Sequence, residues 1–277
     1  MKELTIELSG HCNLDCIHCS HDRENEEQID HPDFEKDELR KILDSYPDFE
    51  KIRISGGEPF HNSLLFFTAS EAKKRKKYVE VLSSGVYERT PEGNLFSIPE
   101  NLLKNSRGLI DKIGFSLYGS EEIHEGITQI KGSFKCLDGS VESARKYQIP
   151  FAFNFVALRD NVKGLEDALN YARYQYLMGA KGVSLRLIRL ICQGSGASNS
   201  EQKLSNQKIK KIIDRVPYLE IKYGIPIYPG CSFSEKGCRA GDEKAVVTSD
   251  GQYLACSALK GYSGEVKPRS FPCRDRW

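Results

Sequence analysis

The sequence lacks any long hydrophobic run. A helix that crosses a membrane needs about 18 or more mostly apolar residues in succession, and no window of the 277 residues approaches that composition. The start of the chain also lacks the basic and then apolar segments of a secretory signal, because the short run Leu4–Leu8 begins almost at once. We therefore expect a cytoplasmic protein with no membrane partner.

The sequence also lacks an excess of charge of either sign. Forty Lys and Arg residues against 39 Asp and Glu residues leave a formal net charge of +1. Nucleic acids and anionic membrane surfaces attract strongly basic proteins, so we expect neither as a partner. The hydrophobic fraction of 39% allows an ordinary core, and the length allows one large α/β domain with a small appendage.

Cysteine, in contrast, is plentiful. The chain has nine cysteines, of which three lie near its start, two in the middle and four after residue 230. In a reducing compartment such numbers indicate metal or redox chemistry before disulfides.

The first group of cysteines follows the first apolar run, where a strand gives way to a loop. It reads Cys12-Asn-Leu-Asp-Cys16-Ile-His-Cys19, so that three sulfurs can converge. A structural zinc ion requires a fourth ligand, and three nearby histidines could supply it: His11, His18 and His21. This segment alone therefore leaves iron and zinc open.

A second motif, Ile54-Ser-Gly-Gly-Glu-Pro-Phe60, ends the next predicted strand. Two glycines let the backbone approach a ligand closely, and proline fixes the exit of the chain. Together with the cysteine spacing, this motif resembles the radical SAM enzymes. The resemblance implies that the three cysteines hold three irons of a [4Fe-4S] cluster whose fourth iron binds S-adenosylmethionine (SAM). It also implies that four residues meet the SAM amino group: Gly56, Gly57, Glu58 and Pro59.

Predicted strands and helices alternate six times along the chain. The strands are near residues 3–9, 51–55, 78–83, 111–118, 150–157 and 182–191, and the helices near 34–46, 63–77, 98–107, 136–147, 162–179 and 201–215. This order predicts an α/β fold with a parallel sheet, and the resemblance makes it a partial (β/α)6 TIM-like barrel with its site at the C-terminal ends of the strands. We expect the barrel in residues 1–215 and a small cysteine-rich domain in 216–277, with a surface excursion from residue 86.

Four further residues at strand ends are predicted to contact SAM: Ser83, Ser116, Asn154 and Arg189. Asn154 lies among aromatic residues and needs a hydrogen-bond partner. Arg186 and Arg189 face opposite ways because side chains alternate along a strand, and Arg189 matches the arginine of the family's Arg-Leu-x-x-x-Gly stretch. We therefore predict that Arg189 binds the SAM carboxylate.

The last four cysteines resemble the opening of the SPASM and twitch cluster domains. The resemblance implies one auxiliary [4Fe-4S] cluster, the second of the chain, with complete cysteine ligation by Cys231, Cys238, Cys256 and Cys273. A four-cysteine zinc site is the alternative. Within this region, residues 246–248 and 253–255 flank a Ser-Asp-Gly-Gln turn and predict a hairpin.

A third set of residues bears on the substrate. His124, Thr128 and Gly132-Ser-Phe134 resemble signatures of radical SAM proteins with a C-terminal cluster domain, many of which modify ribosomally made peptides, although packing would also explain the histidine and threonine. Cys192 lies one residue past the sixth predicted strand, where its thiol could donate a hydrogen atom to a substrate radical; a simple packing residue is the alternative.

The predicted activity is reductive cleavage of SAM to a 5′-deoxyadenosyl radical, which takes hydrogen from a substrate. A peptide that becomes epimerised or cross-linked through a thioether or carbon–carbon bond is the first candidate. The alternative is a small-molecule dehydrogenase or cyclase of cofactor or natural-product biosynthesis, and a zinc-stapled binding protein is the third. A radical SAM enzyme needs a reducing partner such as ferredoxin or flavodoxin.

Overall fold

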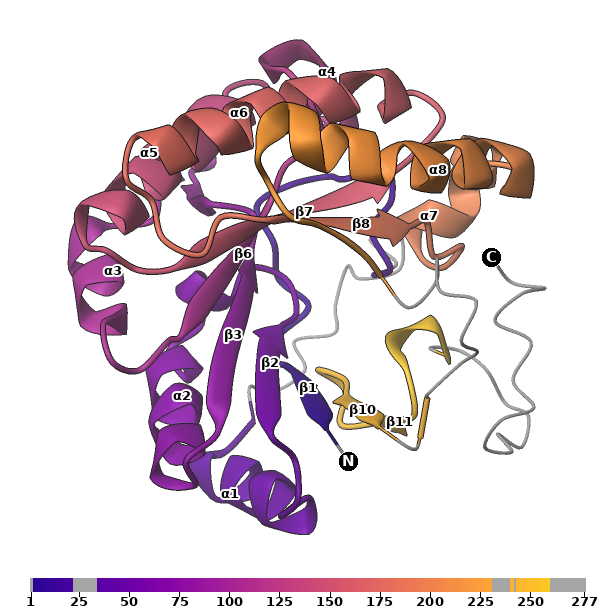
Figure 1. Ribbon diagram of the computed structural model, residues 1–277. Coiled ribbons are helices and arrows are strands. Elements are labelled where there is room, and N and C mark those ends of the chain that lie inside the picture. Colours follow the sequence, from indigo (N-terminus) through magenta and orange to yellow (C-terminus); the bar gives the residue numbers. More distant parts are fainter. Residues whose placement is uncertain (1, 22–33, 231–239, 242, 260–277) are drawn as a thin grey trace.

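The computed structural model describes residues 2–21, 34–230, 240–241 and 243–259. In these ranges the chain forms a curved sheet with helices along its outer side (Figure 1). The strands are β1 (Glu3–Glu7), β2 (Lys51–Ser55), β3 (Tyr78–Ser83), β4 (Val86–Arg89), β5 (Leu95–Ser97), β6 (Lys112–Ser116), β7 (Phe151–Ala157), β8 (Leu185–Arg189), β9 (Ile227–Pro229), β10 (Lys244–Val247) and β11 (Tyr253–Leu254).

The α-helices lie between the strands along the chain. They are α1 (Lys36–Ser45), α2 (Leu65–Lys74), α3 (Glu100–Ser106), α4 (Glu121–Thr128), α5 (Ser133–Lys146), α6 (Leu165–Leu177), α7 (Ser195–Ser198) and α8 (Asn206–Tyr223). Short 3₁₀ turns include η1 (Pro59–His61), η2 (Val162–Gly164), η3 (Ser200–Gln202) and η5 (Ser257–Leu259). No helix in the described ranges is both long enough and apolar enough to span a membrane.

The main sheet has the strand order β11-β10-β1-β2-β3-β6-β7-β8-β9. All of its neighbouring strands are parallel except the antiparallel pair β10 and β11. The prediction of a mostly parallel α/β sheet is therefore confirmed, and its six strands correspond to β1, β2, β3, β6, β7 and β8. The C-terminal ends of these strands meet at one edge, the barrel mouth.

The predicted C-terminal hairpin is also confirmed, and it belongs to the barrel sheet. β10 pairs with β11 through Val246 opposite Leu254 and Val247 opposite Tyr253. On its other side β10 runs parallel to β1, with Lys244 opposite Glu3. Residues after the predicted domain boundary therefore extend the sheet of the barrel, while the division into two domains stays a prediction.

The surface excursion expected from residue 86 contains a second, two-stranded sheet made of β4 and β5. Two other local predictions need correction. The helix α4 was not predicted, because eight residues are too few for a clear helical period. The predicted helix end at residue 215 lies inside α8, which continues past Pro217 to Tyr223. Burial of Val216 and Leu219 against the core outweighs the hydrogen bond lost at this proline.

The inner and outer faces of the sheet differ in chemistry. On β2, Ile52 and Ile54 are fully buried toward the helices, whereas Lys51 and Arg53 alternate with them and face the barrel interior. The inner face of the strands' N-terminal half carries a set of ion pairs that we call the floor network: Glu3, Lys51, Arg53, Glu80 and Arg186.

Candidate active site

The cysteine loop, residues 9–21, begins just after β1 at the barrel mouth. Its three cysteines, Cys12, Cys16 and Cys19, are half-buried, and the Cys19 N–H donates to the Cys16 carbonyl at 3.1 Å. Burial raises the pKa of Tyr118 well above its usual value, and negative charge on the three cysteines raises it further. All three thiols are therefore close enough to the Tyr118 phenol to influence its charge.

The Gly-Gly-Glu-Pro segment after β2 holds the start of the cysteine loop. The Gly57 N–H donates to the Ser9 carbonyl and the Glu58 N–H to the His11 carbonyl, each at 2.8 Å. A Cβ atom on Gly57 would lie 1.5 Å from the His11 carbonyl oxygen, and one on Gly56, whose φ is +122°, would lie 2.5 Å from that of Ser9. The two backbones thus meet at a distance that only glycine allows.

The Glu58 carboxylate is fully buried and points to the next strand. It accepts hydrogen bonds from Ser83 Oγ at 2.8 Å, Ser84 Oγ at 2.7 Å, the Ser84 N–H at 2.9 Å and the Phe60 N–H at 3.2 Å. Burial raises the pKa of Glu58, and these hydrogen bonds act against that rise. Glu58 and Ser83 therefore join the ends of β2 and β3, and Pro59 begins the turn η1 beside them.

The middle of the cysteine loop is held by the C-terminal end of α4. The Asp15 N–H donates to the Thr128 carbonyl and the Ile17 N–H to the Ile127 carbonyl, each at 3.1 Å. The last carbonyls of a helix have no partner within the helix, so α4 offers acceptors that the loop uses. The segment of His124 and Thr128, which resembles a family signature, therefore holds the cysteine loop through its backbone carbonyls.

The end of the cysteine loop is held by a segment that the sequence prediction missed. The Gly196 N–H donates to the Cys19 carbonyl at 3.0 Å and the Ser195 N–H to the His21 carbonyl at 3.3 Å. Gly194 has a φ of +52°, and a Cβ atom on it would lie 2.3 Å from the His21 carbonyl oxygen. The available signal was the Gly-Ser-Gly triplet soon after the sixth predicted strand.

Aromatic rings stack beneath the cysteine loop. The His18 ring meets Tyr118 edge-on at 4.8 Å, and Tyr118 stacks on His124 at 5.3 Å. His18 Nε2 and both ring nitrogens of His124 are buried and have no hydrogen-bond partner among the described residues. Burial lowers the pKa of His18 to about 4 and that of His124 to about 3, so both rings are neutral at physiological pH.

Ser116 and Asn154 are neighbours across β6 and β7. Asn154 Oδ1 accepts a hydrogen bond from Arg186 Nη1 at 3.3 Å, and Ser116 hydrogen-bonds Tyr118. Gly114 provides the space for the amide, since a Cβ atom there would lie 2.7 Å from Asn154 Nδ2. Both predicted contact residues therefore lie on the inner face of the sheet.

Arg189 ends β8 at the mouth, and its guanidinium donates to Asn206 Oδ1 at 2.9 Å at the start of α8. Burial lowers the pKa of Arg189. The two arginines of β8 do face opposite ways, and Arg186 is the one whose guanidinium reaches the barrel interior. The SAM-carboxylate role of Arg189 stays a prediction.

Cys192 is half-buried three residues after β8. It packs against an apolar group beside the cysteine loop, formed by Tyr118, Ile127, Leu158 and Leu190. The next side chain, Gln193, donates from Nε2 to the Ala258 carbonyl at 2.8 Å. Residues close to Cys256 in sequence therefore reach the barrel mouth.

Three predicted ligands of the second cluster, Cys231, Cys238 and Cys273, lie outside the described residues, and Cys256 is half-buried. Within the described ranges, no three His, Cys, Asp or Glu side chains are arranged to hold a single metal ion.

Sequence comparison assigns the chain to a family. A model of the radical SAM superfamily matches residues 6–172, and the chain belongs to that superfamily. Radical SAM proteins bind a [4Fe-4S] cluster and SAM, and the protein is a radical SAM enzyme. The AdoMet-dependent heme synthase of Methanosarcina barkeri is 23% identical over 98% of this chain and 80% of its own length. A probable GTP 3',8-cyclase of Methanocella arvoryzae is 26% identical over 83% of this chain and 70% of its own.

Solved structures share the fold at lower identity. Streptococcus suis SuiB bound to the precursor peptide SuiA has a TM-score of 0.74 and 15% identity, with 96% of this chain and 62% of SuiB covered. Native anSMEcpe with bound AdoMet has a TM-score of 0.66 and 18% identity, with 93% and 75% covered. The chain thus spans less than two thirds of SuiB, and these likenesses establish a radical SAM barrel-like fold.

Proposed function

We propose that this chain reductively cleaves SAM at a [4Fe-4S] cluster held by Cys12, Cys16 and Cys19, and removes hydrogen from a substrate. The observation that carries the proposal is the close contact of Gly56 and Gly57 with the cysteine loop. This contact supports a site in which the glycine segment holds the cysteine loop in place and lies beside the group that the three thiols bind. The half-buried state of all three thiols supports it further.

When bound, the cluster supplies one electron that splits SAM into methionine and a 5′-deoxyadenosyl radical. The residues of this chain have the remaining tasks of orientation and exclusion of water. Gly56, Gly57, Glu58 and Pro59 would meet the SAM amino group, and the buried Glu58–Ser83 hydrogen bond keeps their backbone in place. Three further side chains at the mouth are proposed to contact SAM: Ser116, Asn154 and Arg189.

A ribosomally made peptide is the proposed substrate. SuiB, solved with its precursor peptide, has the same fold as this chain, and the His124 and Gly132-Ser-Phe134 stretches carry the sequence resemblance to peptide-modifying enzymes. The second candidate is a small molecule in a dehydrogenase or cyclase reaction. It is favoured by the curated relatives, among them the probable GTP 3',8-cyclases and the heme synthase.

A second [4Fe-4S] cluster, held by Cys231, Cys238, Cys256 and Cys273, completes the proposal. Cys256 precedes the turn η5, whose Ala258 carbonyl accepts the hydrogen bond from Gln193 at the mouth. This contact supports an auxiliary domain, residues 216–277, that closes over the substrate.

Cys192 is the proposed hydrogen donor if the product is an epimer. Its S–H would give a hydrogen atom to the substrate carbon radical, forming a C–H bond and leaving a thiyl radical. One electron from a ferredoxin or flavodoxin and one proton restore the thiol. With the peptide substrate in D2O, the wild type should place one deuterium at the inverted α-carbon, and Cys192→Ala should form 5′-deoxyadenosine without inversion. Full inversion by Cys192→Ala would remove the donor role.

The core of the proposal is tested by SAM cleavage without substrate. Anaerobically reconstituted, dithionite-reduced protein should form 5′-deoxyadenosine, and Gly57→Val should not, because its side chain would displace the cysteine loop. The matched control is Gly126→Ala, since a Cβ atom on Gly126 meets nothing within 4 Å. Equal yields from wild type and Gly57→Val would contradict the proposal.

The substrate class is tested by stimulation of that same product. Peptides encoded beside the gene should raise the rate of 5′-deoxyadenosine formation and gain or lose mass in the assay. Stimulation by GTP and none by any such peptide would instead establish the small-molecule alternative.

A further inference from the structure

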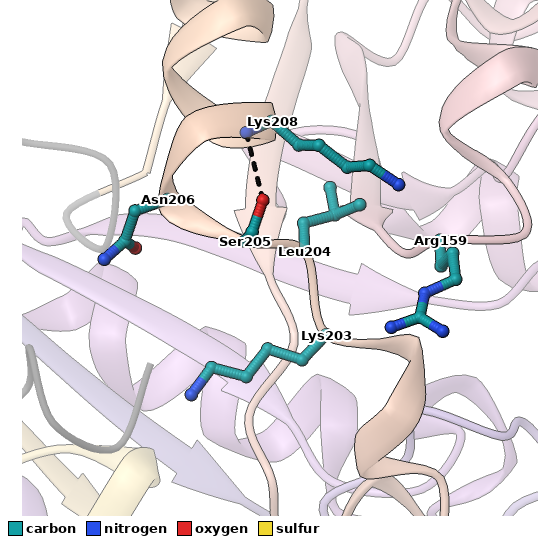
Figure 2. Close-up of a pocket in the computed structure, with 6 residues that line it drawn as sticks. All are labelled: Arg159, Lys203, Leu204, Ser205, Asn206 and Lys208. Carbon is teal, nitrogen blue, oxygen red and sulfur yellow. Dashed lines mark hydrogen bonds between the residues drawn. The ribbon is translucent and has the colours of Figure 1, made fainter.

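A surface pocket of about 610 Å³ lies near the barrel mouth, beyond the ends of β7 and β8. Its lining comes from the residue two positions after β7 and from the segment that leads into α8: Arg159, Lys203, Leu204, Ser205, Asn206 and Lys208 (Figure 2). The two segments are fixed to each other, because the Arg159 N–H donates to the Gln202 carbonyl at 2.9 Å and Gln202 Nε2 donates to Asp160 Oδ2 at 2.7 Å. The pocket is therefore built from anchored backbone.

Of the described residues that line the pocket, three are cationic and none carries a carboxylate. Among the described residues, Arg159, Lys203 and Lys208 make no side-chain hydrogen bond or ion pair, in contrast to the lysine and arginines of the floor network. In Figure 2 the Arg159 and Lys208 side chains extend to one side of Leu204 and the Lys203 side chain to the other. The positive charge is thus spread around the apolar base that Leu204, 4% exposed, provides.

The start of α8 adds to the positive potential. Ser205 caps α8 by accepting from the Lys208 N–H at 3.3 Å, so the positive end of this 18-residue helix faces the pocket. Asn206 Oδ1 accepts from Arg189 at 2.9 Å, which directs the amide of Asn206 and links the pocket to the residue proposed to bind the SAM carboxylate. The pocket lining is therefore one hydrogen bond away from Arg189.

We propose that this pocket binds a multiply charged anionic part of the substrate, either a phosphate chain or a pair of carboxylates. That this anion belongs to the substrate rests on the proposed function, whereas the anion site itself does not. Three uncompensated cations within one pocket attract such a group over a range that salt shortens. A phosphorylated small molecule and an acidic peptide segment share this chemistry, and the two probes below separate them.

The test is calorimetric titration of the reconstituted protein with inorganic tripolyphosphate and, separately, with a hexaglutamate peptide. Arg159→Glu/Lys208→Glu should weaken binding of the effective probe by about tenfold or more, equal to about 1.4 kcal/mol, and added salt should weaken wild-type binding. The matched control is Lys210→Glu/Lys211→Glu, which makes the same charge change at two residues of α8 outside the pocket lining. The control should bind as the wild type does.

Each outcome decides the proposal. Binding of tripolyphosphate alone assigns a phosphate chain, and binding of hexaglutamate alone or of both assigns carboxylate recognition as well; each supports the site. Failure of both probes to bind the wild type, or equal weakening by the control pair, overturns it. Lys203→Gln is a milder variant that keeps the test valid if the double reversal fails to fold. Basal 5′-deoxyadenosine formation should be unchanged in the pocket variants, so a failure of SAM cleavage in the wild type would count against the proposed function alone.

Discussion

The charged network on the floor of this barrel and the two buried histidines at its mouth differ in how their polar atoms are paired. In the floor network the Glu80 carboxylate, which is 1% exposed, accepts from Arg53 Nε at 2.9 Å and from Arg186 Nη2 at 3.0 Å. The Glu3 carboxylate accepts from Arg53 Nη1 at 2.6 Å. At the mouth, His18 and His124 have buried ring nitrogens with no partner among the described residues. Among the described residues, the charged groups of the floor network pair with one another, whereas these two histidines at the mouth keep buried ring nitrogens without a hydrogen-bond partner.

This difference separates stability from function within one sheet. In TIM-like barrels the C-terminal ends of the strands carry the chemistry and the opposite end carries stability. Burial alone would raise the pKa of Glu80, but Arg53, Arg186 and Lys51 together hold it well below its usual range. Substitutions in the floor should therefore change the free energy of unfolding, and those in the cysteine loop should change cofactor binding.

Glu80→Gln should have the largest effect on stability. It leaves three cations around a neutral amide, and removing one partner of a buried ionic group costs about 3–5 kcal/mol. Denaturant unfolding of the variant and the wild type measures the difference. A loss below about 1 kcal/mol, the value of an exposed pair, would show that the floor is not a closed network.

The same carboxylate predicts how stability depends on acid. Because the folded pKa of Glu80 is below its unfolded value, its contribution is present above the unfolded pKa of about 4.3 and is lost as pH falls toward the folded pKa. The difference between wild type and Glu80→Gln should therefore shrink below about pH 4. A gap that widened in acid would contradict the assigned direction of the shift.

His124→Phe should have a smaller effect and one with a distinct pH profile. The folded pKa of His124 is about 3, so between that value and the unfolded value of about 6.5 the unfolded chain binds more protons and stability rises with pH. The wild type should lose about 1.6 kcal/mol more than the variant between pH 6.5 and pH 5, because the full slope of about 1.4 kcal/mol per unit is reached only below the unfolded pKa. Parallel unfolding curves across this range would mean that His124 is protonated in the fold.

Glu100→Gln should have the smallest effect and serves as the exposed counterpart of Glu80. Its carboxylate accepts from Lys146 Nζ at 2.8 Å and Tyr147 Oη at 2.7 Å on the surface. Water and salt screen such an exposed pair, so the unfolding midpoint should barely move. A loss comparable with that of Glu80→Gln would erase the distinction between buried and exposed ion pairs in this protein.

Much of the barrel could be predicted because its signals are local. On β2, isoleucines alternate with charged residues, and on β7, a run of aromatic residues marks a strand buried between neighbours. The cysteine loop and the glycine motif are recognisable for the same reason, since each is continuous in sequence. Short elements such as α4 could not be predicted because their eight residues or fewer give too few turns for a clear periodic pattern.

The rest depends on contacts between distant residues. Glu80 and Arg186 meet only because β3 and β8 face the same interior, and Gly194 meets His21 only because the segment after β8 folds back onto the cysteine loop. Nothing in either local sequence states the partner. The predicted SAM contacts Ser83 and Arg189 likewise have neighbours, Glu58 and Asn206, that spacing alone does not reveal.

The central claim, that the cysteine loop is completed by an iron–sulfur cluster, is tested most directly by counting iron. Anaerobically reconstituted wild type should hold about eight irons per chain, four in each of two clusters. The Cys12→Ala/Cys16→Ala/Cys19→Ala variant should keep about four, because only the loop's cluster is lost. An unchanged iron count in the variant, a variant without iron, or zinc in place of iron in the wild type would contradict the account.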